Sequence, residues 1–100
     1  MPIYHIVLFK LKPGVDPAQV TEWITLAKAM VGLIPGLLKL EANTPLAATA
    51  HRSQGYEVGL ISVMEKQGDL KVYAEHPVHS KVHQLREELC TDTLAYDLEF

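Results

Sequence analysis

The chain has 100 residues, of which 48% are hydrophobic and 21% are charged, and its formal net charge is −3 at pH 7. A chain of this length suits one domain, residues 1–100, which can bury most of its apolar surface. The acidic balance argues against a nucleic-acid partner, because nucleic-acid-binding domains usually present a basic face.

Cys90 is the only cysteine, so no disulfide can form within the chain and a reducing compartment is expected. The N-terminal residues lack the basic flank and cleavage site of a signal peptide. The longest apolar stretch, residues 26–40, is interrupted by Lys28, Gly32 and Pro35 and is too short to span a bilayer. We expect a cytoplasmic protein with no membrane partner.

Residues 3–11, "IYHIVLFKL", are rich in β-branched and aromatic residues and precede the turn signal Pro13-Gly14. The pattern predicts a strand. Because side chains alternate along a strand, His5, Val7 and Phe9 share one face, and the other face also is mainly apolar. Both faces are therefore expected to be covered.

The next segment predicts a helix with Asp16 as N-cap and Pro17 in its first position. Apolar residues recur there at spacings of three and four and form one stripe. The stripe consists of Val20, Trp23, Ile24, Ala27, Met30, Val31 and Ile34. We expect the helix to end around Gly32, Pro35 and Gly36.

The second half of the chain predicts three more strands, a polar loop and a helix pair. The strands are expected at residues 37–47, 55–66 and 91–100, and the loop at 49–55. A short helix capped by Asp69 is expected at 69–75, and a second helix begins at Pro77, with Val78, Val82, Leu85 and Leu89 as its stripe.

This order of elements is the split βαβ order of an α+β, ferredoxin-like fold, a four-stranded antiparallel sheet with helices on one face. The first and third strands look apolar on both faces, and the chain has no further element to cover the second face. An exposed apolar face of this size is an association surface. We therefore predict a homodimer through the sheet faces, a dimeric α/β barrel.

Residues 72–83, "VYAEHPVHSKVH", hold three of the five histidines. On a helix that begins at Pro77, His79 lies about 60° from Val82, at the border of the apolar stripe. Tyr73 shares a face with Leu70, so His79, Tyr73 and His5 can meet in one apolar cavity. There an imidazole can take a proton near neutral pH, and a phenol can donate to an oxygen that gains enolate charge.

The sequence resembles the stress-responsive A/B barrel domain family, also called dimeric α/β barrel proteins. The resemblance covers essentially the whole chain and is carried by "HIVLFKLKPG", "IPG", "GYEVGLISV" and "YAEHPVHSKV". It implies the ferredoxin-like protomer and the dimer. One member type, the plant olivetolic acid cyclase, closes a linear polyketide by intramolecular aldol condensation. The positions that match its pocket are His5, Tyr73 and His79, while Val58 stands where that enzyme has a histidine.

The resemblance implies a cofactor-independent, acid–base enzyme of polyketide cyclase type that acts on a small apolar carbonyl compound. The alternative is a non-enzymatic stress-response homodimer or binding protein, in which His79 and Tyr73 anchor a turn and His5 is a core residue. A third hypothesis is a haem-using or cofactor-free monooxygenase, with His76 or His79 as a haem ligand.

Metal binding is a fourth alternative, because His79 and His83 are four residues apart and share a helical face. No third ligand is evident, and zinc requires three or four. We therefore expect no metal and no cofactor. His51 is expected to be solvated, and Trp23 and Cys90 to be packing residues.

Overall fold

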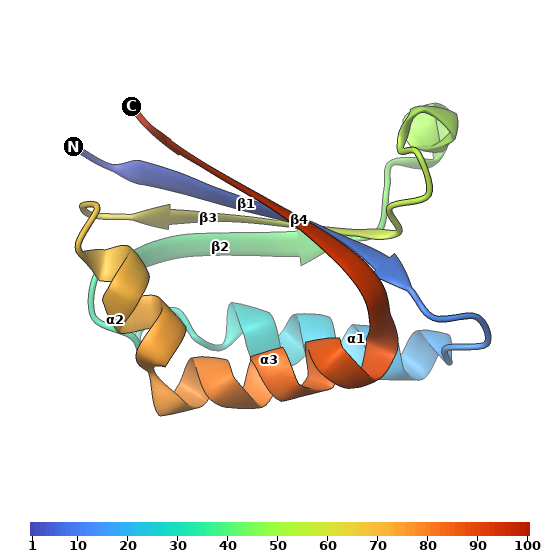
Figure 1. Cartoon of the computed structure of the whole chain (residues 1–100), viewed down its shortest axis with the longest axis horizontal. Helices are drawn as coiled ribbons and strands as arrows, with labels where there is room; N and C mark the ends of the chain where they lie inside the picture. Colours follow the sequence, from blue (N-terminus) through green and yellow to red (C-terminus); the bar gives the residue numbers. More distant parts are fainter.

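The computed structural model describes residues 1–100 and contains the predicted order of elements (Figure 1). Four strands, three α-helices and one short 3₁₀ helix are present: β1 (Ile3–Leu11), α1 (Pro17–Lys28), β2 (Leu37–Asn43), η1 (Ala47–Arg52), β3 (Val58–Met64), α2 (Asp69–Glu75), α3 (Pro77–Leu89) and β4 (Cys90–Glu99). None of the helices is long and apolar enough to cross a membrane.

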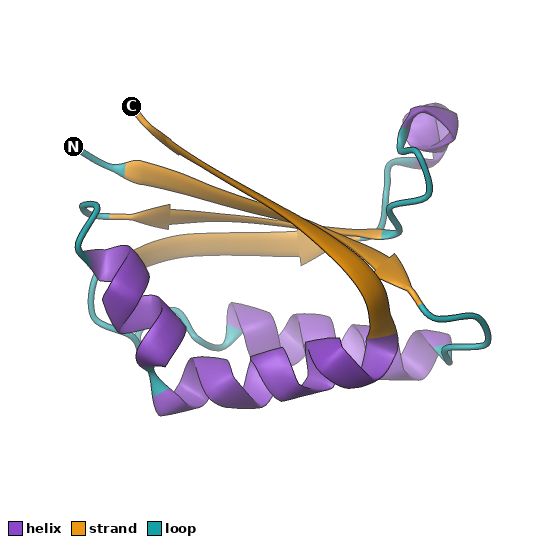
Figure 2. Cartoon of the chain, in the orientation of Figure 1, coloured by secondary structure: helices purple, strands orange, loops and turns teal.

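The strands form one antiparallel sheet in the order β2-β3-β1-β4, with β1 and β3 in the centre. All three α-helices lie on the same side of this sheet, whereas η1 projects on the opposite side (Figure 2). The arrangement confirms the α+β, ferredoxin-like fold that the order of elements predicts.

The first helix begins as expected and ends early. The Asp16 carboxylate accepts a hydrogen bond from the Ala18 N–H, and the Gln19 side-chain oxygen accepts one from the Asp16 N–H. The helix ends at Lys28, and the prediction that it continues toward Gly32 is wrong. From Met30 onward the chain tightens into turns whose N–H groups bond three residues back, as from the Met30 N–H to the Ala27 carbonyl.

Several other boundaries differ from the sequence-based expectation. The second strand ends at Asn43 rather than 47, and the expected polar loop contains η1. Gly68, not Asp69, is the N-cap of α2. Asp69 is the first residue of that helix, and its carboxylate accepts a hydrogen bond from the Lys66 N–H at 3.1 Å, which stabilises the turn before the helix.

The hydrophobic core lies between the sheet and the helices. Met30 and Met64 are fully buried, and the Phe9 ring meets the Trp23 indole edge to face with centroids 4.7 Å apart. The predicted helix stripe therefore supplies core residues, although Val31 is exposed. Met30 and Ile34 remain buried even though they lie beyond the end of α1, because the turns that follow keep them above the sheet.

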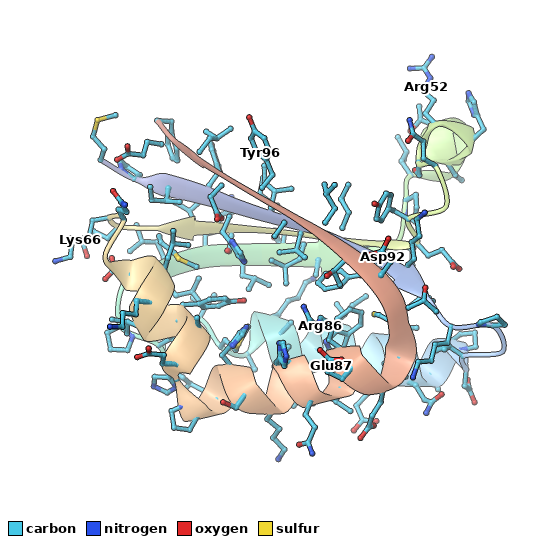
Figure 3. The ribbon with its side chains drawn as sticks, viewed as in Figure 1. Arg52, Lys66, Arg86, Glu87, Asp92 and Tyr96 are labelled. Carbon is cyan, nitrogen blue, oxygen red and sulfur yellow. The ribbon has the colours of Figure 1, made fainter.

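The face of the sheet opposite the helices is apolar and has no cover within the chain. On the central strands it carries Tyr4, Ile6, Leu8 and Ile61, and on β4 it carries Leu94, Tyr96 and Leu98. The Tyr4 and Phe100 rings stack there at 4.0 Å. Figure 3 shows Tyr96 pointing away from the helices on this face.

Candidate functional site

A cavity of about 310 Å³ lies between the sheet and the helix pair α2–α3. Its lining is mostly apolar, and its polar groups come from β1, β4, α2 and α3. The cavity brings together all the residues that the sequence singles out as candidates for catalysis: His5, Tyr73 and His79.

Alternation along two paired strands supplies the sheet side of the cavity. His5, Val7 and Phe9 of β1 lie opposite Asp97, Ala95 and Thr93 of β4 in the antiparallel register, and all six line the cavity. Side chains two residues apart on a strand point to the same face, so both strands present every second residue to the cavity.

The junction between α2 and α3 places Tyr73 beside His79. The His76 ring Nδ1 accepts a hydrogen bond from the Val78 N–H at 3.1 Å and so caps α3. The Tyr73 and His79 rings lie 4.4 Å apart between centroids. Tyr73 is only 5% exposed, and burial raises its pKa to about 12. Its hydroxyl is therefore protonated, and can donate a hydrogen bond, across the physiological pH range.

His79 has the opposite electrostatic character. Burial lowers the pKa of its imidazole, and the positive charges of His83, His5 and Arg86 add to this effect; the nearby Ala74 carbonyl opposes it. Its Nδ1 is inaccessible to solvent and has no hydrogen-bond partner of normal geometry. His79 lines the cavity, and Nε2 is its other ring nitrogen. The lowered pKa makes the imidazole neutral at pH 7, which is the form that can accept a proton.

His5 is held by a carboxylate that the sequence reasoning missed. The His5 Nδ1 lies 2.5 Å from the Asp97 carboxylate, and the His5 ring meets the Tyr73 ring at 5.5 Å, edge to face. This contact occupies Nδ1 and leaves Nε2 as the other ring nitrogen of a residue that lines the cavity. Only the strand register, which places Asp97 opposite His5, could have identified this residue.

Two further polar residues, His83 and Arg86, line the cavity farther along α3. One Arg86 Nη atom lies 3.3 Å from His83 Nε2 and 2.5 Å from the Glu87 carboxylate. His83 and His79 are close, with ring centroids 5.9 Å apart. No group of three or more His, Cys, Asp or Glu side chains is arranged to hold a metal ion.

The remaining residues that the sequence singled out lie outside the polar part of the cavity. Val58 is buried and does not line the cavity. It lines a separate, small apolar void together with Trp23. Trp23 is a core residue, as predicted, and also forms part of the cavity wall. Cys90 is half-buried at the end of α3, where burial raises its pKa to about 11. His51 is exposed on η1.

Comparison with known proteins identifies the family. The family model described as the Stress responsive A/B Barrel Domain matches residues 3–100. The chain belongs to this family. The sequence has no match among curated proteins.

Solved structures with the same fold include several dimers. A dimeric ferredoxin-like protein of unknown function from Thermobifida fusca has a TM-score of 0.86 and 24% identity, with coverage of 100% of this chain and 92% of that one. A dimeric protein of unknown function from Bacteroides fragilis has a TM-score of 0.79 and 25% identity, covering 99% and 96%. The hydroxynitrile lyase from Passiflora edulis has a TM-score of 0.85 and 16% identity, covering 97% and 91%.

Proposed function

We propose that the protein is a cofactor-independent acid–base enzyme that forms a carbon–carbon bond between two carbonyl groups of one substrate, a ring closure of polyketide cyclase type. The observation that carries this proposal is the contact between a neutral imidazole and a protonated phenol in an apolar cavity. Tyr73 and His79 lie 4.4 Å apart between ring centroids, and burial shifts their pKa values in opposite directions. Such a pair is suited to act as acid and base on one substrate.

The proposed reaction begins with His79 Nε2 taking a proton from the carbon next to a substrate carbonyl. The Tyr73 hydroxyl donates a hydrogen bond to that carbonyl oxygen as it gains enolate charge. The enolate carbon then forms a bond to the second carbonyl carbon, whose oxygen receives the proton from the His79 imidazolium. In this step His5 acts with both ring nitrogens protonated: Nδ1–H donates to the Asp97 carboxylate and Nε2–H donates to the second carbonyl oxygen. Loss of water from the resulting β-hydroxy ketone completes an aldol condensation.

The apolar lining supports a substrate with a hydrocarbon body. Val7, Phe9, Leu60 and Val82 form walls that offer no hydrogen bonds from their side chains, so the polar groups lie in a few positions. A cavity of about 310 Å³ also reaches the size at which small-molecule sites begin. A purely structural homodimer needs no such space, so the cavity favours a protein that binds a ligand over a purely structural one.

Carbon–carbon bond cleavage next to a carbonyl is the reverse of this chemistry and uses the same two groups. Cleavage of a cyanohydrin, the activity named for the Passiflora edulis structure, would begin with His79 accepting the hydroxyl proton. As the carbonyl forms, the carbon–carbon bond breaks, and cyanide leaves with the electron pair and takes the proton from the His79 imidazolium. The apolar cavity and the neutral His79 fit both directions, so a lyase is the second candidate function.

Exchange of α-protons tests the first step without knowledge of the natural substrate. With decan-2-one in deuterated buffer, we expect the wild type to accelerate deuterium uptake, measured by mass spectrometry. His79→Asn and Tyr73→Phe should each slow this exchange by roughly 10²–10⁴-fold, the usual range for loss of a general acid or base.

Matched controls are available outside the cavity. His51→Asn changes an exposed histidine on η1, and Tyr56→Phe removes a phenol beside Lys10, so both variants should exchange like the wild type. Exchange that is unaffected in both cavity variants would refute the proposed roles of His79 and Tyr73.

A further inference from the structure

The cavity carries a positive charge on α3 away from His79. Arg86 is the only lysine or arginine among the residues that line the cavity, and its side chain is 27% exposed. In Figure 3 Arg86 lies between α3 and the sheet rather than on the outer side of the helix. The sheet residue at this end is Thr93 of β4.

The spacing between Arg86 and His79 follows from the helix that carries both. They are seven residues apart on α3, which is about two turns and about 10 Å along the helix axis. The antiparallel strand β4 runs beside the same cavity, with Asp97 opposite His5 and Thr93 opposite Phe9. The wall between the two ends is apolar and includes Val7, Ala95 and Val82.

The present partners of Arg86 leave it able to bind a ligand. It donates to the Glu87 carboxylate at 2.5 Å, and Glu87 is 62% exposed. An ion pair with so exposed a partner contributes little, because water screens it. A guanidinium group has five N–H donors, so it can also bind an anion from the cavity side.

We propose that Arg86, with His83 beside it, binds a carboxylate of the substrate, so that the substrate is an elongated keto acid whose reacting carbonyl and carboxylate lie about 10 Å apart. The placement of the carbonyl at His79 rests on the function proposed above. The carboxylate site itself rests on Arg86, its exposed partner Glu87 and the apolar wall that separates it from His79.

The other charged groups near the cavity are compatible with a substrate carboxylate at Arg86 and a carbonyl at His79. Asp97 is the only acidic residue in the lining, and it lies at the opposite end in contact with His5. Glu87 and Asp92 do not line the cavity; they line a separate small polar hollow that Arg86 also borders. A carboxylate is therefore expected on the cavity side of the guanidinium, away from these two acids.

Trp23 provides a measurement of binding that does not depend on turnover. It is the only tryptophan in the chain and lines the cavity. Its fluorescence can be titrated with 9-oxodecanoate, whose extended chain separates carbonyl and carboxylate by about this distance, and with decan-2-one, which has the same carbonyl and no carboxylate. We expect 9-oxodecanoate to bind the wild type about tenfold more tightly, the effect of one charge-assisted hydrogen bond.

The variant Arg86→Gln should raise the Kd of 9-oxodecanoate about tenfold and leave the Kd of decan-2-one unchanged. Lys81→Gln makes the same change of charge at an exposed position of the same helix and should leave both Kd values unchanged. An equal loss of affinity in both charge variants would show a general electrostatic effect and overturn the inference. So would a Kd for 9-oxodecanoate that is unaffected in Arg86→Gln.

Glu87→Gln tests the same site if Arg86→Gln fails to fold, because it changes an exposed side chain and frees the guanidinium. We expect 9-oxodecanoate to bind roughly threefold more tightly to this variant, in line with the weak pair that is removed. Unchanged or weaker binding would contradict the inference. If Arg86→Gln weakens binding of 9-oxodecanoate but His79→Asn does not slow exchange, the carboxylate site stands and the proposed function fails. If His79→Asn slows exchange but Arg86→Gln leaves the Kd of 9-oxodecanoate unchanged, the proposed function stands and the carboxylate site fails.

Discussion

Burial acts on Tyr73 and His79 in opposite senses because the two side chains carry charge in opposite protonation states. The charged form of tyrosine is the deprotonated one, so burial raises the pKa of Tyr73 to about 12. The charged form of histidine is the protonated one, so burial lowers the pKa of His79. One apolar environment thus prepares a donor and an acceptor side by side.

These pKa shifts predict the pH dependence of α-proton exchange. His79 is active when neutral, so the rate should fall as the pH drops through its pKa, at a midpoint below the ordinary histidine value of 6.5. The rate should not fall near the ordinary tyrosine pKa of about 10, because Tyr73 stays protonated there.

The check is the exchange rate of decan-2-one across pH, compared with an NMR titration of the His79 ring. A midpoint above 6.5 would mean that the imidazole is not destabilised as a cation. Loss of rate near pH 10 would mean that the Tyr73 phenol ionises like an exposed tyrosine.

At the scale of elements, the turn before β2 packs closely against the first residue of α2. Gly36 has a φ of +83°, and a Cβ atom there would lie 2.3 Å from the Asp69 carboxyl carbon. The Gly36 carbonyl also accepts a hydrogen bond from the Glu65 N–H at 3.0 Å. The start of α2, and with it the position of Tyr73, therefore depends on a residue without a side chain at 36.

Gly36→Ala should destabilise the protein more than Gly14→Ala does. Both glycines have positive φ, which costs an alanine about 1–2 kcal/mol, but an added Cβ at Gly14 meets nothing within 4 Å. The clash with Asp69 adds to this cost at Gly36 alone. Urea unfolding measures both variants, and equal losses of free energy of unfolding would show that Asp69 moves aside freely.

Local patterns in the sequence predict the elements better than their ends. Asp16 and Pro17 mark the start of α1 because a cap and a fixed φ act within one turn of the chain. The end of α1 at Lys28 cannot be predicted from the apolar pattern, because the helical spacing of Met30 and Ile34 continues through the turns that follow the helix. Tertiary packing keeps these two residues buried without a helix.

The candidate site shows the same division. The spacing of Tyr73 and His79 around Pro77 predicts that they approach one another, because the contact is local in the chain. Asp97 and Arg86 were not predicted as cavity residues. Asp97 meets His5 across 92 positions of sequence, and only the register between β1 and β4 determines that pairing.

At the scale of the whole molecule, one face of the sheet is apolar and uncovered. Leu94 and Tyr96 on this face are 46% and 60% exposed, and Ile61 in the sheet is 42% exposed. Structures with the same fold from Thermobifida fusca and Bacteroides fragilis are dimeric. We propose that two copies of this chain associate through this face, because burial of the two faces removes both from water.

Ile61→Glu should convert the proposed dimer into a monomer, because it places an unpaired charge in the centre of an apolar interface. Leu33→Glu makes a comparable change at a side chain that is 57% exposed and lies outside the sheet, and should leave the mass unchanged. Light scattering after size exclusion measures both. A wild-type protein that is monomeric at micromolar concentration would contradict the proposed assembly.

In strands β1 and β4, alternate residues face opposite sides of the sheet. Odd-numbered positions from His5 to Phe9 and from Thr93 to Asp97 line the cavity, whereas the even-numbered ones between them face the other way. Substitutions at the odd-numbered positions can therefore change which substrate the cavity accepts without altering the face proposed for dimerisation. A single-residue insertion in either strand would move the cavity residues to the opposite face and the residues of that face into the cavity. Functional homologues should therefore lack such insertions in β1 and β4.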